Sequence, residues 1–294
     1  MGVMRGKWIA VALAVLGVSA AFAVVSLQKG GVDPVASAAT KSVAADGANV
    51  ALTVGVDSPK GTFNVSANGV VDQGQADITA DLSQVLSAAG LPAGNGSVEL
   101  RYLQENGDPV VYVNAPALTS MIPGGKSWVR LDLEQAAKSA GVDLNQMLAQ
   151  AAQNPTDVLD MLRAAGSVKS LGPEPVDGVQ ATHYQATIDL AKAAGMVGSP
   201  AQQAVQHLID QGGPSTIPVD VWIGDDGFVH KLTVDETVGT SSDTATVHLN
   251  LGLSGYGTTS VNVTAPPSDD TLDATGLVAM AAQNLQSGTG TIGG

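Results

Sequence analysis

The chain has 294 residues and a formal net charge of −14, from 13 basic and 27 acidic side chains. This acidic surplus argues against nucleic acid as a partner, because the phosphate backbone is bound mainly by Lys and Arg. The lack of cysteine excludes disulfides, thiolate metal sites, a Cys nucleophile and a lipidated Cys anchor. Hydrophobic residues reach 44% with only 3% aromatic, so the apolar content is mainly aliphatic and a folded core is expected.

The amino terminus contains a candidate membrane segment. Trp8 to Leu27 is an uncharged stretch of 20 residues, and Arg5 and Lys7 precede it. As a helix, this stretch is long enough to cross the roughly 30 Å hydrocarbon layer of a bilayer. Basic residues before such a segment stay in the cytoplasm, so we expect everything after Leu27 to be extracytoplasmic.

This segment has two alternative fates, retention as an anchor or removal as a secretory signal. The apolar region of a signal peptide has about 7–15 residues, so the length of this stretch favours an anchor. Ala36-Ser37-Ala38 nevertheless offers an acceptable cleavage site, and Ala21-Phe22-Ala23 a weaker one, so a secreted chain cut near Ala38 is the alternative. Residues 28–47 show no sustained period and are expected to form a flexible linker.

From residue 48 onward the pattern predicts β-strands. Val50, Leu52, Val54 and Val56 alternate with small or polar residues, and the pattern repeats after a turn. Further strands are expected at 75–85, 97–104, 109–113, 128–133, 168–175, 179–190, 216–224, 228–238, 245–254 and 260–263. Residues 105–108 and 225–227 carry the Asn-Gly and Asp-Gly signals of hairpin turns.

Three stretches have a helical period instead. Leu144, Met147, Leu148 and Ala151 follow the spacing i, i+3, i+4, i+7, as do Val158, Met161 and Leu162 after Pro155. A third helix, opened by Ser199-Pro200, places Ala204, Val205 and Leu208 on one face. Since strands outnumber helices and adjoin by hairpins, the sequence predicts an α+β fold with helices packed on one face of a large antiparallel sheet. We expect this domain to cover 48–265, followed by a frayed tail over 266–294 with a short helix at 272–283.

Catalytic motifs are absent from the sequence. There is no G-x-S-x-G or H-E-x-x-H, and the G-x-G-x-x-G at residues 288–293 has no strand before it and no helix after it. His183, His230 and His248 lie in strand segments, where pairing with Asp220, Asp235 or Asp189 would orient a general base. The alternative is that they are half-exposed sheet residues. We therefore predict no catalytic residue, no metal ligand and no cofactor.

Several strand segments resemble those of a known family. They are 108–113 (DPVVYV) with 125–132 (GKSWVRLD), 178–184 (GVQATHY) and 217–225 (IPVDVWIGD). Their order and separation resemble the LppX/LprG group of cell-envelope lipoproteins, whose fold is similar to that of the periplasmic lipoprotein carrier LolA. The likeness covers roughly residues 48–265.

This resemblance implies a strongly curved sheet, a half barrel, whose concave face is closed by helices over an apolar cavity for acyl chains. The residues expected to line the cavity are Leu144, Met147, Leu148, Ala151, Val158, Met161, Leu162, Ala204, Val205 and Leu208. The family's lipidated Cys is missing, so attachment to the membrane depends on Trp8 to Leu27.

Three alternative functions are compatible with the sequence. The first is non-enzymatic binding or carriage of a lipid or glycolipid at the outer side of the cytoplasmic membrane, with an envelope transport protein as a further partner. The second is a structural or sensory ectodomain, anchored to the membrane, that binds a protein partner. The third is a hydrolase that uses one of the strand histidines.

Overall fold

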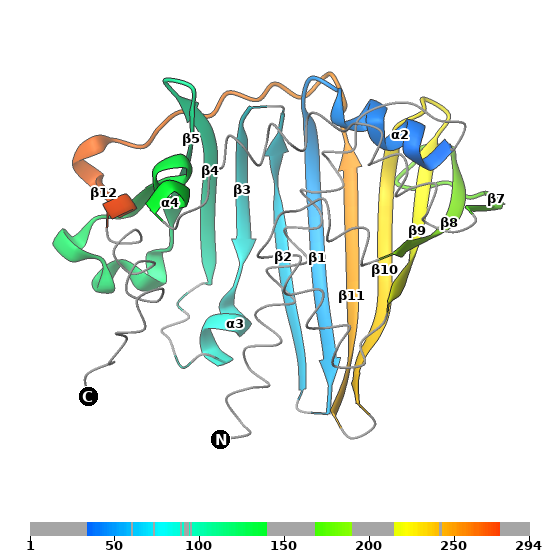
Figure 1. Ribbon diagram of the computed structural model, residues 1–294, viewed down its shortest axis with the longest axis horizontal. Helices are drawn as coiled ribbons and strands as arrows, with labels where there is room; N and C mark the ends of the chain where they lie inside the picture. Colours follow the sequence, from blue (N-terminus) through cyan, green and yellow to red (C-terminus); the bar gives the residue numbers. More distant parts are fainter. Residues whose placement is uncertain are drawn as a thin grey trace.

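The computed structural model describes residues 34–59, 61–72, 74–88, 90, 94, 96–139, 168–189, 215–240 and 243–276. One 12-stranded sheet dominates this part of the chain (Figure 1). Its strands are β1 Ala48–Ser58, β2 Gly61–Val71, β3 Ala76–Asp81, β4 Ser97–Glu105, β5 Asp108–Asn114, β6 Trp128–Asp132, β7 Lys169–Pro173, β8 Ala181–Asp189, β9 Thr216–Gly224, β10 Val229–Thr240, β11 Asp243–Ser254 and β12 Thr271–Asp273. The helices are α2 Pro34–Val43, α3 Ser83–Ala88 and α4 Leu133–Ser139, with 3-10 turns η1 Pro116–Met121, η2 Pro123–Gly125 and η3 Ser268–Asp270.

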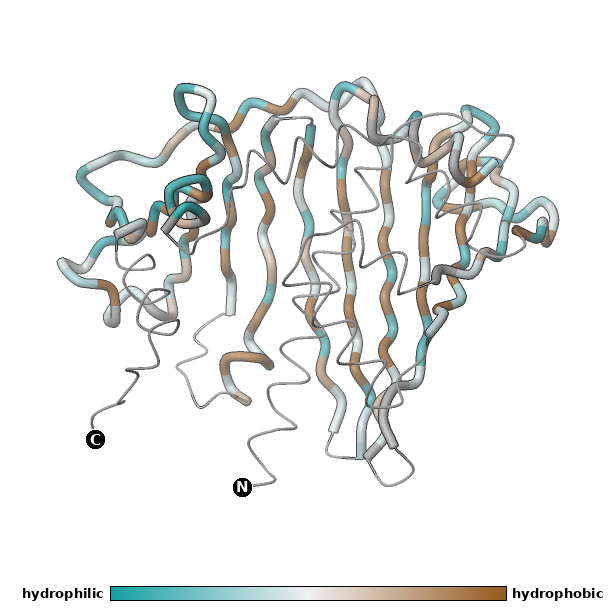
Figure 2. The backbone as a smooth tube through the Cα atoms, viewed as in Figure 1, coloured by the Kyte–Doolittle hydropathy of each residue, from teal (hydrophilic) through white to brown (hydrophobic). Residues whose placement is uncertain are grey.

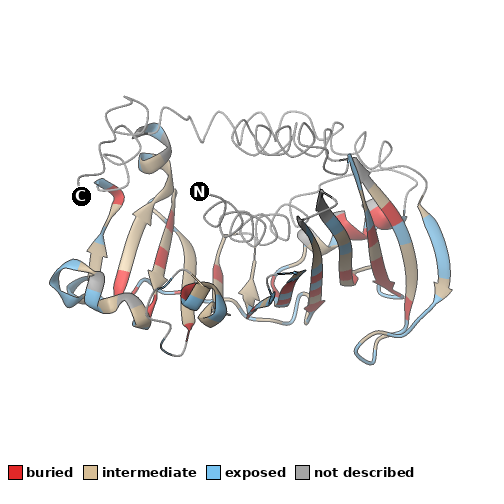
Figure 3. Cartoon of the chain, turned by 90° about the horizontal axis from the view of Figure 1, so that it is seen from below, coloured by how far each residue is buried: buried red, intermediate tan, exposed pale blue. Residues whose placement is uncertain are grey.

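The sheet consists of two antiparallel meanders joined at its centre. Its strand order is β12-β6-β5-β4-β3-β2-β1-β11-β10-β9-β8-β7. The meander β1 to β6 meets the meander β7 to β11 where β1 pairs with β11, so that Leu52 lies opposite Leu251. Figure 3 shows that the sheet bends into an open trough rather than closing into a barrel. The predicted fold, one large curved sheet with helices, is confirmed, except that β12 pairs with β6 in parallel.

The turns of two tight hairpins have a left-handed backbone conformation, with positive φ, at residue types that adopt it readily. Asn106 and Gly107 join β4 to β5 with φ values of 54° and 95°, and Asp177 and Gly178 join β7 to β8 with 50° and 81°. Asn, Asp and Gly adopt positive φ at the lowest cost, and two such residues in a row fit the twist of a hairpin. The turn predicted at 105–108 is therefore confirmed.

The linker predicted over 28–47 is wrong for residues 34–43, which form α2. Small Ala and Ser residues concealed any period there, yet Ala favours helix and Pro34 fits a first helical position. Val35 and Ala38 are 7% and 3% exposed in the main core, so packing on the sheet stabilises this short helix.

The strand predicted over 75–85 ends earlier than expected. β3 stops at Asp81, whose carboxylate accepts a hydrogen bond of 2.9 Å from the Ser83 N–H and starts α3. The side chain of Leu86 is buried, which fixes this short helix against the sheet.

The carboxyl-terminal part of the domain also differs from expectation. Residues 260–263 form no strand, and residues 255–270 run along one end of the sheet to reach β12, which pairs with β6 (Figure 1). Leu272 and Asp273 are therefore strand residues rather than the start of a helix, and the domain extends beyond residue 265. Two hydrogen bonds of 2.9 Å secure this end, from the Ala274 N–H to the Arg130 carbonyl and from the Asp132 N–H to the Thr275 hydroxyl.

Candidate functional site

One face of the sheet is apolar because of the alternation along its strands. Val50, Leu52, Val54 and Val56 point to the same side of β1, since successive strand residues face opposite sides. Antiparallel pairing continues this side across the sheet, and Figure 2 shows the alternation along the central strands. We call it the apolar face; its described members are Val50, Leu52, Val54, Val56, Phe63, Val65, Ala67, Ala76, Ile78, Ala80, Val98, Leu100, Tyr102, Val111, Val113, Val129, Leu131, Tyr184, Ala186, Ile217, Val219, Val221, Leu232, Val234, Val247, Leu249, Leu251 and Leu253.

The centre of the apolar face is a packed core. Leu251 is 1% exposed, and Val54 and Val219 are 2% exposed. Val35 and Ala38 of α2 belong to the same cluster, so α2 lies on this side of the sheet, over β9 and β10. At these buried residues the face is already covered and is not available to a ligand.

The arm of the sheet from β3 to β6 differs from the centre. Ile78, Leu100, Val113 and Val129 are aligned in one cross-strand row, and all four are half-buried. Tyr102, Val111 and Leu131 form a second half-buried row beside it. Every described residue that β3 to β6 contribute to this side is uncharged. The arm is therefore an accessible aliphatic surface continuous with the core, and it is the candidate site.

The lining residues predicted from the sequence lie outside the described residues. They are Leu144, Met147, Leu148, Ala151, Val158, Met161, Leu162, Ala204, Val205 and Leu208. The described site is built instead from strands, which the sequence predicts as part of the sheet but not as ligand-binding elements. Their alternation was visible in the sequence, whereas their partial exposure was not, because exposure depends on what packs above the strand.

The opposite face of the same arm carries a second, smaller core. Val110, Tyr112 and Trp128 are buried there, and the Arg101 guanidinium lies 4.7 Å from the centre of the Trp128 ring. Beside them, Arg130 contacts Glu105, which also accepts a hydrogen bond from the Tyr112 hydroxyl. Burial opposes the ionisation of Glu105, but the hydrogen bonds from Tyr112 and Arg130 outweigh it and lower the pKa of this carboxyl. Burial and Glu105 together raise the pKa of Tyr112.

The strand histidines also lie away from the apolar face. Both ring nitrogens of His183 are engaged by carboxylates, Nε2 with Asp220 at 2.8 Å and Nδ1 with Glu174 at 2.9 Å. The ring stacks on Trp222 with a centroid distance of 4.1 Å. A general base needs a free ring nitrogen directed at a hydroxyl or a water molecule. The pairing predicted with Asp220 is confirmed, but it does not favour the hydrolase hypothesis.

His248 is also held by two carboxylates, and His230 is held by one. Nδ1 of His248 contacts Asp235, as predicted, and its Nε2 lies 3.3 Å from Asp57, so the ring connects β11 to β10 and β1. The hydrogen bond to Asp235 raises the pKa of His248. His230 contacts Asp226 at 3.0 Å within the β9–β10 hairpin. Across the described ranges, no group of three or more His, Asp or Glu side chains is placed to hold a metal ion.

The membrane segment predicted at Trp8 to Leu27 lies outside the described residues. Among the helices that are described, none combines the length and hydropathy needed to span a bilayer.

The fold and the site together define an open, curved sheet with an accessible aliphatic arm. No family model matches the chain. The chain is 31% identical over 196 residues to an uncharacterized 31.2 kDa protein, encoded in the rplA-rplJ intergenic region of Streptomyces griseus. This match covers 65% of the chain and about 60% of the relative's length.

Several solved structures have a similar arrangement of strands. The lipoprotein LppX of Mycobacterium tuberculosis matches 82% of this chain and 98% of its own, with 18% identity and a TM-score of 0.43. LprF of Mycobacterium bovis matches 79% of this chain and 93% of its own, with 16% identity and a TM-score of 0.41. A putative outer membrane lipoprotein-sorting protein domain from Vibrio parahaemolyticus matches 76% of this chain and 88% of its own, with 8% identity and a TM-score of 0.22. LppX and LprF are of the lipoprotein group that the sequence motifs resemble, and the Vibrio domain is of the lipoprotein-sorting kind. With TM-scores below 0.5, these likenesses do not decide the function.

Proposed function

We propose that the protein is a non-enzymatic binder or carrier of a lipid or glycolipid, and that the acyl chains lie against the apolar face where it spans β3 to β6. The observation that supports this proposal is the half-buried, uncharged row Ile78, Leu100, Val113 and Val129. In this proposal the ten helical residues predicted from the sequence form the opposite wall of the site.

The chemistry of the row suits an acyl chain. Each methylene group removed from water contributes about 0.8 kcal/mol, so a long chain gains much from an apolar surface without any directional contact. Aliphatic side chains supply that surface and leave no polar atom unpaired against the ligand. A peptide or a phosphate would instead require several hydrogen-bond donors, whereas the row Ile78, Leu100, Val113 and Val129 has none in its side chains.

The proposed place of action is the outer side of the cytoplasmic membrane. The basic residues Arg5 and Lys7 before Trp8 to Leu27 predict that the domain is exported and stays attached. A carrier in this position has a reason to enclose acyl chains, because they must otherwise cross an aqueous envelope. An envelope transport protein is the partner that would deliver or receive the lipid.

The test is gentle mass spectrometry of the full-length protein, extracted in mild detergent from its native host. We expect a mass excess that yields a lipid on denaturation, and binding of a fluorescent fatty acyl probe after the lipid is removed. Val113→Trp, which fills the half-buried row, should weaken probe binding. The matched control is Thr79→Trp, because Thr79 is exposed on the opposite face of β3.

Three results would count against the proposal: no bound lipid, no probe binding by the delipidated wild type, or equal effects of the two Trp variants. Any of them would favour the alternative, a structural or sensory ectodomain that binds a protein partner.

A further inference from the structure

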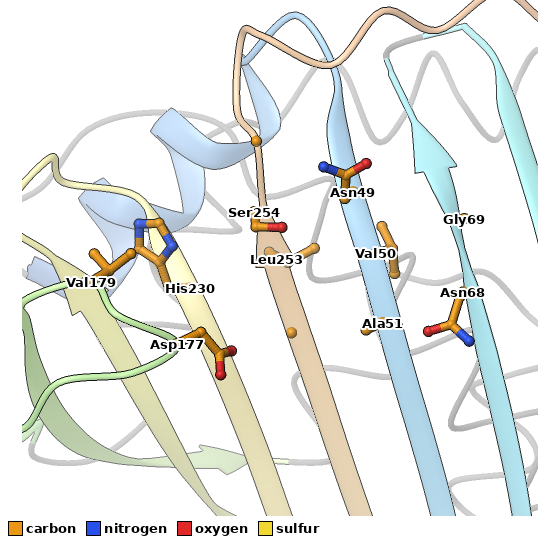
Figure 4. Close-up of a pocket in the computed structure, with 12 residues that line it drawn as sticks. Asn49, Val50, Ala51, Asn68, Gly69, Asp177, Val179, His230, Leu253 and Ser254 are labelled. Atoms are coloured by element: carbon orange, nitrogen blue, oxygen red, sulfur yellow. The ribbon is translucent and has the colours of Figure 1, made fainter.

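The face of the sheet opposite the apolar face carries a shallow pocket. It has a volume of about 600 Å³ and lies between β1, β2 and β11 and the turn that joins β7 to β8. Figure 4 views it from this side, with the strand order reversed relative to Figure 1 and the β7–β8 turn in front of β10. This volume falls within the range of about 300–1,000 Å³ typical of sites for small ligands. The pocket is thus separated from the proposed lipid site by the thickness of the sheet.

Neutral polar side chains line the pocket together with His230 and the apolar residues Val50, Val179 and Leu253. Asn49, Asn68 and Ser254 are exposed and point away from the apolar face, since they alternate with its members along β1, β2 and β11. Within the described part of the chain, these three side chains have no hydrogen-bond partner, so their polar atoms are available to a ligand. An amide or a hydroxyl can both donate and accept a hydrogen bond.

The floor and one wall of the pocket are held in place by the backbone. Ala51 and Gly252 are cross-strand partners on β1 and β11, so small residues leave the floor flat. Asp177 stands on the wall, in a turn closed by hydrogen bonds of 2.9 and 2.8 Å between Val176 and Val179. A site whose groups are already positioned loses little conformational entropy when a ligand binds.

Asn49 owes its position to a glycine. A Cβ on Gly255, whose φ is +67°, would lie 2.5 Å from the Asn49 amide nitrogen. Only glycine allows the Asn49 amide to lie this close to the backbone at the rim of the pocket.

The lining excludes several classes of ligand. An acyl chain would desolvate the amides and the carboxylate without satisfying them. An anion would meet Asp177 and a chain of net charge −14, with no Lys or Arg among the described lining residues. A peptide strand has no free edge to pair with, because β1 is paired on both sides, with β2 and with β11.

We propose that this pocket binds a neutral, polyhydroxylated ligand, a glycan. Sugar hydroxyls both donate and accept, which matches the Asn and Ser side chains, and a carboxylate such as that of Asp177 accepts from adjacent hydroxyls. Exposed, uncharged side chains of Thr53, Ser66 and Asn250 continue from the pocket along the same face, so an oligosaccharide of several rings has further partners. This site is independent of the proposed lipid site.

The experiment is saturation-transfer NMR on the full-length protein in detergent, with chitotetraose, maltotetraose and mannotetraose as soluble probes. We expect saturation transfer to at least one of the three. The double variant Asn49→Ala with Asn68→Ala should weaken that binding about tenfold, the loss expected for two neutral hydrogen bonds. The control is Gln185→Ala, because Gln185 is an exposed amide on the same face, on β8 and outside the pocket; it should leave binding unchanged.

Three outcomes would overturn the proposal. One is the absence of binding for all three oligosaccharides, and another is the same affinity in the double variant as in the wild type. The third is equal binding of an end-blocked tetra-alanine peptide, which would indicate a peptide site. Binding of the fluorescent acyl probe should be the same in the double variant, because Asn49 and Asn68 lie on the other side of the sheet from the proposed lipid site.

Discussion

Arg130 of β6 forms an ion pair of 2.9 Å with Asp273 of β12, a residue 143 positions further along the chain. The same guanidinium contacts Glu105 at 2.9 Å. One side chain thus connects the β4–β5 hairpin, the sheet edge and the carboxyl-terminal strand. Because β12 is only three residues long and pairs in parallel, its backbone bonds alone hold it weakly.

We predict that Arg130→Met lowers the free energy of unfolding by about 1–3 kcal/mol, because it leaves Glu105 partly buried beside Tyr112 without its cation. Because the Arg130 side chain is 21% exposed, water screens its ion pairs, and the loss of stability should be smaller than for a fully buried pair. Denaturant unfolding measures this loss. Asp273→Asn is the control; with a side chain 56% exposed, Asp273 should contribute less than about 1 kcal/mol. An equal loss of unfolding free energy in both variants would contradict the prediction that Arg130 contributes more than Asp273.

The same cluster should make stability depend on acid. Burial opposes ionisation of Asp273, but hydrogen bonds from Thr275 and the charge of Arg130 outweigh it, so its pKa is lowered, as is that of Glu105. A carboxyl whose pKa is lower in the folded state stabilises the fold above its ordinary pKa of about 4, and this stabilisation is lost as the pH falls through the lowered pKa. We predict a decline in unfolding free energy below about pH 4 that is shallower in Arg130→Met. A parallel decline in both proteins would show that other carboxyls dominate.

His248 should titrate above the ordinary histidine pKa of about 6.5, because of its hydrogen bond to Asp235 and the charge of Asp57. The effect of pH on stability is therefore opposite in sign to that of the two carboxyls. Stabilisation by His248 is complete below the ordinary pKa and is lost as the pH rises through the raised one. NMR titration of the ring protons measures the midpoint. Asp235→Asn should lower it, whereas Asp220→Asn, which affects His183 instead, should not.

Helix α2 gives a test of how the amino terminus is processed. Ala38 is 3% exposed in the core, whereas its neighbour Ser37 is exposed. Ala38→Asp should cost several kcal/mol, because it buries a carboxylate without a partner, while Ser37→Asp should stay within about 0.5 kcal/mol. Thermal unfolding of each variant, purified in the form that the native host produces, distinguishes the two.

Wild-type stability of Ala38→Asp would show that this helix is absent from the mature protein, as expected if the chain were cut after Ala38. Retention as an anchor predicts instead that the amino terminus stays at Met1 or Gly2 and that the protein remains with membranes after a high-pH wash.

The strands of the sheet were largely readable from the sequence because their signal is local. Residues 216–224 alternate over nine positions and form β9 within the same bounds, and Asn106-Gly107 identifies its turn without reference to the rest of the chain. The elements that were missed, α2 and β12, have no hydrophobic period in the sequence. α2 consists mainly of small residues, with only two Val to mark an apolar side. β12 exists because β6 offers a free edge 143 residues earlier.

The candidate site was less predictable than the fold. Val54 and Val113 are the same residue type in the same kind of strand, yet the first is 2% exposed and the second half-buried. The difference arises from the position of each strand in the sheet, and that position depends on the nonlocal pairing of β1 with β11. Sequence periodicity therefore identified the apolar face but not the part of it that a ligand can reach.

The final prediction uses this contrast to separate a ligand surface from a filled core. Leu251 is 1% exposed in the packed centre, so Leu251→Ala should cost about 2–5 kcal/mol whether or not lipid is bound. Leu100 lies on the same face but is half-buried, so Leu100→Ala in the delipidated protein should cost less, about 1 kcal/mol.

With saturating acyl ligand the cost of Leu100→Ala should increase, because a ligand that binds only the folded state adds stability in proportion to its affinity, and the variant binds it less well. Denaturant unfolding measures the loss of unfolding free energy in Leu251→Ala and in Leu100→Ala, each with and without the ligand. Equal losses for Leu100→Ala in the two conditions, together with unchanged probe binding, would show that the arm from β3 to β6 is ordinary core, and the lipid site would have to be sought elsewhere in the protein.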